Sequence, residues 1–131
     1  MATDPIVVLP TDLNPGGGAT GQTLALANWP TEGVATEVAP LHVHHSDDEA
    51  WYVIEGALRF RLADRELLAT AGSTVLVPAG VPHTFGNAGP EPSRYLIIMP
   101  TRLQEMISKL HVVDAAEQAS VYEQYDSQLL E

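Results

Sequence analysis

Residues 42–49 of this chain read HVHHSDDE, and the placing of histidine and glutamate within them decides which fold can be expected. Continued to Gly56, the stretch has the pattern HxHx4Ex6G. A second stretch, residues 72–87, has the pattern Gx5PxGx2Hx3N and adds a further histidine. Imidazole and carboxylate form a borderline ligand set that suits one divalent iron, manganese, nickel, copper or zinc ion. The candidate metal ligands are His42, His44, Glu49 and His83.

These side chains can converge if the chain folds as strands. Residues two apart in a strand point to the same face, so His42 and His44 share a face. Residues 49–54 (EAWYVI) are rich in aromatic and β-branched side chains, which predicts that Glu49 begins a neighbouring strand. His83 follows a distant strand-like segment, residues 74–77, and a Pro-Ala-Gly turn. A β-barrel can bring the three segments together, whereas a single amphipathic helix cannot.

The two motifs resemble those of the cupin superfamily over roughly residues 36–100. They stand in the same order, and the 15 residues between Gly56 and Gly72 are typical of small microbial cupins. The chain is most similar to small single-domain cupins of the conserved-barrel, quercetin-dioxygenase-like type. This resemblance implies a small antiparallel β-barrel (a double-stranded β-helix or jelly roll) with the metal inside. It also implies that the four candidate side chains are the ligands, and that Glu49 can detach and act as a catalytic base.

The expected fold class is therefore all-β, followed by one or two short α-helices. Turn signals and period-two patterns predict strands at 23–29, 35–44, 49–55, 57–63, 66–70, 73–78, 83–88 and 93–100. After Pro100 the period changes to that of a helix face, and a second helix is expected over residues 114–125. The residues that repeat at helical spacing are Leu103, Met106, Ile107 and Leu110. Both helices are expected to pack on the outside of the barrel.

Length and charge limit the classes of protein that fit. With 131 residues we expect a single domain, divided into an arm and loop (1–22), the barrel (23–100) and the C-terminal helices (101–131). A net charge of −11 argues against binding to nucleic acid or to anionic membranes. No apolar run approaches the ~18 residues that span a bilayer. The first residues do not resemble a secretory signal, so a cytoplasmic location is expected.

Several residues beside the ligands have candidate roles. Trp51 and Val53 share the face of Glu49, and Phe85 shares the face of His83, so all three are candidates to bind a substrate inside the barrel. The alternative is that they form plain barrel core. His45 points away from the pair and is expected at the surface or beside the ligands. The remaining polar motif residues are expected to be structural: Asp47 and Asp48 in a turn, one of them a candidate to orient a histidine, and Asn87 at a loop.

A metal with four protein ligands keeps two of six positions open, which favours an oxidoreductase of the dioxygenase type. Its substrate would be a small chelating enol, diketone or catechol-like compound. Two alternatives stay open: an isomerase, decarboxylase or lyase acting on a small keto acid or sugar, and a non-enzymatic module that binds a small ligand or a metal.

A homodimer is also expected, by analogy with small cupins. The strand-like segment Ile6–Leu9 is a candidate for exchange between the two subunits. The alternative is that this segment folds onto the barrel of its own chain.

Overall fold

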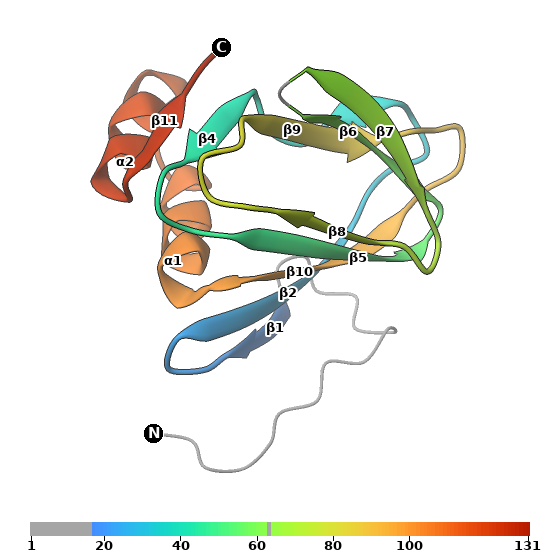
Figure 1. Ribbon diagram of the computed structural model, residues 1–131, viewed down its shortest axis with the longest axis horizontal. Helices are drawn as coiled ribbons and strands as arrows, with labels where there is room; N and C mark the ends of the chain where they lie inside the picture. The colour runs from blue at the N-terminus through green and yellow to red at the C-terminus, as the bar shows by residue number, and fades with distance from the viewer. Residues whose placement is uncertain (1–16, 63) are drawn as a thin grey trace.

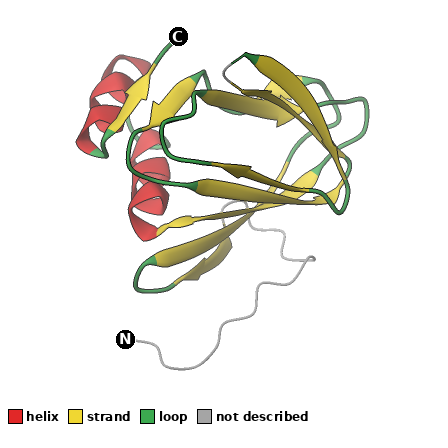
Figure 2. Cartoon of the chain, in the orientation of Figure 1, coloured by secondary structure: helices red, strands yellow, loops and turns green. Residues whose placement is uncertain are grey.

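The computed structural model describes residues 17–62 and 64–131, which form two sheets that face each other (Figure 1). The first sheet consists, in order, of β1 (Gly17–Thr20), β2 (Leu24–Pro30), β10 (Arg94–Pro100), β5 (Glu49–Glu55) and β8 (Thr74–Val77). The second consists of β11 (Ser127–Leu129), β4 (His42–His44), β9 (His83–Asn87), β6 (Ala57–Leu62) and β7 (Arg65–Thr70), with β3 (Thr36–Glu37) also paired to β9. Every pair is antiparallel (Figure 2), and the expected all-β antiparallel architecture is confirmed.

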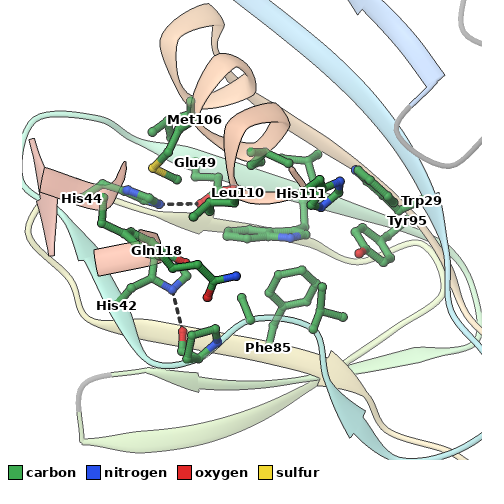
Figure 3. A pocket seen from close by; sticks show the side chains of 18 residues that line it. Trp29, His42, His44, Glu49, Phe85, Tyr95, Met106, Leu110, His111 and Gln118 are labelled. Carbon is green, nitrogen blue, oxygen red and sulfur yellow. Dashed lines mark hydrogen bonds and ion pairs between the residues drawn. The ribbon is translucent and has the colours of Figure 1, made fainter. Parts of the chain in front are cut away.

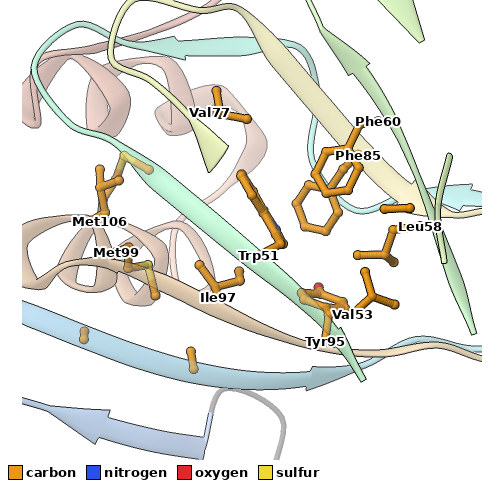
Figure 4. Close-up of a cluster of buried hydrophobic side chains, with 14 of the residues drawn as sticks. Trp51, Val53, Leu58, Phe60, Val77, Phe85, Tyr95, Ile97, Met99 and Met106 are labelled. Carbon is orange, nitrogen blue, oxygen red and sulfur yellow. The ribbon is translucent and has the colours of Figure 1, made fainter. Parts of the chain in front are cut away.

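The core lies between the two sheets, and alternation along the strands fills it. In β5, Trp51 and Val53 are buried with Glu49 on the inner face, as the period-two pattern predicted. The Trp51 ring meets those of Phe60 and Phe85 edge-on, at 5.2 Å between centroids in each case (Figure 4). Such aromatic pairs contribute about 0.5–1.5 kcal/mol each beyond the area that they bury. In β10, Tyr95, Ile97 and Met99 point inward and are buried.

One predicted strand is divided in two. The sequence predicted a single strand over residues 35–44, but the structure has the separate strands β3 and β4. Glu37 pairs with Gly86, and His42 pairs with His83. The chain therefore advances five residues on this side while β9 advances only three. The two surplus residues leave the ladder near Pro40, which has no N–H to donate to it. This excursion brings the backbone carbonyl of Pro40 next to the ring of His42.

The two ends of the described chain also differ from expectation. Residues 1–22 were predicted to be arm and loop, but Gly17–Thr20 is strand β1, paired with β2. Glycine-rich residues give no alternating pattern from which such a strand can be recognised. Residues 101–131 were predicted to be helical throughout, but Ser127–Leu129 is strand β11, paired with β4. The segment Ile6–Leu9 lies outside the described residues, so its exchange between subunits and the homodimer stay predictions.

The helices close one end of the molecule. Helix α1 (Thr101–Leu110) contacts β2 and β10, whereas α2 (Gln118–Gln124), which follows a 3-10 turn at Ala115–Glu117, contacts β11. The two helices therefore lie outside the sheets and cover one end of the barrel (Figure 1). From there α1 sends Leu103 and Met106 into the core, which the expectation of packing on the outside did not include. In the described part of the chain, neither helix has the length and apolar composition needed to cross a membrane.

A network of hydrogen bonds around Asn87 and Ser93 holds the end of the barrel near Gly56. The amide of Asn87 donates to three loop carbonyls, and the hydroxyl of Ser93 lies within hydrogen-bonding distance of the Asn87 side-chain oxygen. The predicted structural role of Asn87 is thereby confirmed. Gly56 fits against Ser93 with φ at +74°, a backbone conformation that favours glycine. This network fixes the turn from β5 into β6, and with it the position of the strand that begins at Glu49.

Replacement of Gly56 by alanine should destabilise the protein more than the same change at Gly72. Both have positive φ, so alanine costs about 1–2 kcal/mol at either. At Gly56 the added Cβ would also lie 2.5 Å from the Pro92 carbonyl oxygen, whereas nothing lies within 4 Å at Gly72. Urea unfolding should show Gly56→Ala to be about 1–3 kcal/mol less stable than Gly72→Ala. Equal stabilities would contradict the close packing of Gly56 against Pro92 and Ser93.

Candidate metal centre

The four candidate ligands meet in one buried cluster drawn from both sheets. His42 and His44 lie on β4, His83 lies opposite His42 on β9, and Glu49 begins β5 in the other sheet. One potential ligand atom from each residue lies within 4.8 Å of those from the other three. Oε1 of Glu49 is 3.3 Å from Nε2 of both His44 and His83. A group of this composition and size can hold a single metal ion; that these residues are its ligands stays a prediction.

In each of the three histidine rings, Nδ1 has a hydrogen-bond partner outside the cluster. Nδ1 of His42 lies 2.7 Å from the Pro40 carbonyl oxygen, and Nδ1 of His83 lies 3.0 Å from that of Val81. A carbonyl can only accept, so Nδ1 carries the proton in both rings and Nε2 keeps a free lone pair. This assignment follows from the hydrogen-bond network, in the way that histidine tautomers are ordinarily assigned.

His44 also carries its proton on Nδ1, and here the hydrogen-bond acceptor is a side chain. Its Nδ1 lies 2.7 Å from the hydroxyl oxygen of Ser127 on β11. That hydroxyl donates its own proton to the Tyr125 carbonyl at 3.1 Å, so it accepts from the ring. Three Nε2 lone pairs and one carboxylate thus face a common space without a proton of their own. Such a set of buried acceptors repels itself unless a cation lies between its members.

Burial and neighbouring groups favour the forms that bind metal. Burial, assisted by the His83 ring, lowers the pKa of His42 to about 4. Burial alone would raise the pKa of Glu49, but hydrogen bonds from His44 and His83, which form when either ring carries a proton on Nε2 as well as on Nδ1, outweigh it and lower that pKa to about 2. The first imidazole is therefore neutral and the carboxyl ionised near neutral pH, as metal ligation requires.

The polar residues that follow the histidine pair do not enter the cluster. His45 is exposed at the surface, one of its two predicted positions. Asp48 accepts a hydrogen bond from the Ala79 backbone at 2.9 Å, and Asp47 forms an ion pair with Arg102 at 2.8 Å. The idea that one of these carboxylates orients a histidine is wrong, because Pro40, Ser127 and Val81 take that place.

A cavity of about 180 Å³ opens beside the cluster (Figure 3). Trp51 and Phe85, two of the predicted substrate-binding residues, line it. Val53, the third, does not line it; it packs in the core with 0% exposure. Contact of any of the three with a substrate stays a prediction.

The helical wall of this cavity was missed by the sequence analysis. Side chains of α1 and α2 line it together with residues from β2 and β10. His111, which follows α1, meets the ring of Trp29 edge-on at 5.3 Å between centroids. The helical face of α1 was visible in the sequence, but nothing local indicated that it faces the histidines. The wall residues missed are Trp29, Met106, Leu110, His111, Gln118 and Tyr122.

Comparison with known proteins agrees with this architecture. A sequence profile of the cupin domain matches residues 34–99, which are 66 of the 131 residues. No curated protein matches the chain. A solved cupin-2 domain containing protein from Shewanella frigidimarina is 26% identical, with 66% of this chain and 82% of that chain covered and a TM-score of 0.54.

Two further solved structures are similar. A sugar phosphate isomerase from a cupin superfamily, from Silicibacter pomeroyi, is 25% identical with a TM-score of 0.55. The match covers 60% of this chain and only 51% of that one. A protein with a double-stranded β-helix domain from Klebsiella pneumoniae is 20% identical over 75% of this chain and 91% of that chain, with a TM-score of 0.62. At that identity the likeness shows the fold alone.

His83→Ala should abolish metal binding. The variant removes one of four ligands and leaves a gap beside Glu49, whereas His45→Ala alters an exposed histidine outside the cluster. Elemental analysis by mass spectrometry, after reconstitution, should find about one metal per chain in the wild type and the control, and little in His83→Ala. A wild type that retains none of iron, manganese, nickel, copper or zinc would contradict the site.

Ser127→Ala should weaken metal binding without destroying it. The change removes the acceptor that fixes the ring of His44, and loss of such a partner typically costs about 10–100-fold in metal affinity. The control is Ser120→Ala, an exposed position on α2. Competition with a chelator would measure both affinities. If Ser127→Ala binds as tightly as the control, the orienting role of β11 is refuted.

Proposed function

The chain belongs to the cupin family, and on that premise we propose that it is a metal-dependent oxidoreductase of the dioxygenase type. Its substrate would be a small chelating compound such as an enol, a diketone or a catechol. One observation carries the proposal: three imidazoles and one carboxylate converge, with open space directly beside them. This ligand set leaves room for a substrate that binds through two oxygens. It is also the set that the quercetin-dioxygenase-like cupins resembling this chain would use.

A bound transition metal would supply Lewis acidity and, where it is redox active, electron transfer. The chain's own residues have separate tasks. Glu49 is ionised and lies at the edge of the cavity, so it is the candidate base for a proton from the substrate hydroxyl. The rings of Trp51 and Phe85 would exclude water from the reacting end of the substrate.

Isomerisation is the second candidate, and one observation favours it. The similar structure from Silicibacter pomeroyi is described as a sugar phosphate isomerase. A phosphate group needs cationic partners, which Arg and Lys ordinarily supply. Among residues 17–62 and 64–131, no lysine or arginine lines the cavity. For that reason we place the isomerase below the dioxygenase.

Dioxygen uptake distinguishes the two candidates. Iron(II)-loaded protein should consume dioxygen when given 2,4-pentanedione or 4-methylcatechol, at about one dioxygen per substrate lost. A dioxygenase adds both oxygen atoms to its substrate, so no reductant need be supplied. His83→Ala, treated identically, should show only background uptake. Turnover of a sugar or keto acid by anaerobic zinc-loaded protein, with no uptake under any metal, would instead support the isomerase or lyase.

A further inference from the structure

The distribution of charge suggests which ligands the cavity accepts. The chain has six lysines and arginines, and every one of them lies outside the cavity wall. They are Arg59, Arg61, Arg65, Arg94, Arg102 and Lys109. Of the carboxylates that the structure describes, only Glu49 lines the wall, and it belongs to the metal cluster. An anionic group that entered this space beyond the metal would lose its water and gain no cationic partner, which is strongly unfavourable.

The remainder of the wall is apolar, with a few neutral donors. Leu103, Met106 and Leu110 of α1 supply its aliphatic side, and Figure 3 shows Leu110 and Gln118 projecting from the helices toward the histidines and Glu49. A volume of about 180 Å³ suits a compound of one substituted ring. A ligand there would be held by apolar contact along the helices, with polar groups only near the cluster.

Tyr122 is placed to act as one of those polar groups. Its side chain is buried and lines the cavity, and its ring lies 5.2 Å from that of His42 between centroids. Its hydroxyl makes no hydrogen bond to any residue that the structure describes. The hydroxyl is not among the buried side-chain atoms that lack a partner, so it is open to the cavity, where a ligand oxygen can accept its hydrogen bond. The ring lies beside His42, so Tyr122 lines the cavity on the side of the metal cluster.

We propose that the cavity selects an uncharged, single-ring compound, and that the Tyr122 hydroxyl donates a hydrogen bond to an oxygen that this compound presents at the histidine cluster. The inference rests on the proposed function only for the presence of the metal, since it concerns binding and not turnover. Selection against charge comes from the wall between α1 and the sheets. Selection for an oxygen-bearing ring comes from Tyr122 and the cluster together.

Two catechols that differ at one substituent test the charge preference. In 4-methylcatechol a neutral methyl stands where 3,4-dihydroxybenzoate carries a carboxylate, while the chelating oxygens are the same. Calorimetric titration of zinc-loaded protein without dioxygen measures binding while excluding oxidation. The methyl compound should bind about tenfold or more tightly. Equal affinity, or tighter binding of the carboxylate, would overturn the proposal.

An added cation should reverse this preference only if it enters the cavity. Leu110→Arg places a guanidinium in the wall and should raise the affinity for 3,4-dihydroxybenzoate relative to 4-methylcatechol by about tenfold. Ser108→Arg adds the same charge to the exposed side of α1 and should leave the ratio as in the wild type. An equal change in both variants would mean that overall charge sets the preference, and would refute selection by the wall.

Tyr122→Phe tests the hydrogen bond alone. The ring stays beside His42, so zinc content and melting temperature should equal those of the wild type. The affinity for 4-methylcatechol should fall about 3–10-fold, as for loss of one hydrogen bond. Unchanged affinity would remove Tyr122 from the binding site. If zinc-loaded protein binds neither catechol, the ligand class is wrong, whereas dioxygen uptake by the iron form with 2,4-pentanedione would still stand as an independent result.

Discussion

The interaction on which the structure depends is the meeting of four acceptor groups in a space from which water is largely excluded. Nδ1 is engaged in all three histidine rings, and Nε2 of His44 and of His83 lies 3.3 Å from the carboxylate of Glu49, with His42 in the same cluster. While Nε2 is unprotonated in all three rings, nothing in this set attracts its other members. The fold must therefore hold them together by force of packing, and a cation is the simplest partner that would turn repulsion into attraction.

The packing that does so comes from both sheets. Trp51 follows Glu49 on the inner face of β5, and its ring lies edge-on to His83 at 5.8 Å and to Phe85 at 5.2 Å between centroids. The aromatic core thus ends directly at the cluster. Beyond the cluster the sheets diverge and α1 and α2 take their place, which leaves the cavity between helix and barrel. The metal cluster and the cavity therefore lie next to each other at the place where the core ends.

The sequence predicted the parts of this arrangement that depend on period-two alternation. His42 with His44, and Glu49 with Trp51 and Val53, follow from one strand each. The orienting groups could not be predicted in this way. Pro40 acts through its backbone, and Ser127 lies on a three-residue strand with no pattern, 83 positions from the ring that it holds. The helical wall was missed for a similar reason: spacing shows that a helix has an apolar face but not which element that face meets.

The position of the helices also bears on how function can be inferred from this fold. The cluster is built entirely from the strands β4, β5 and β9. The helices α1 and α2 lie outside the two sequence motifs, and they supply part of the cavity wall. Similar structures can therefore share the cluster and differ in ligand, because the wall changes independently of the strands. A sugar phosphate isomerase and this chain can have the same barrel. In the part of the chain that the structure describes, the cavity wall has no lysine or arginine, and similarity of fold alone does not reveal such a feature.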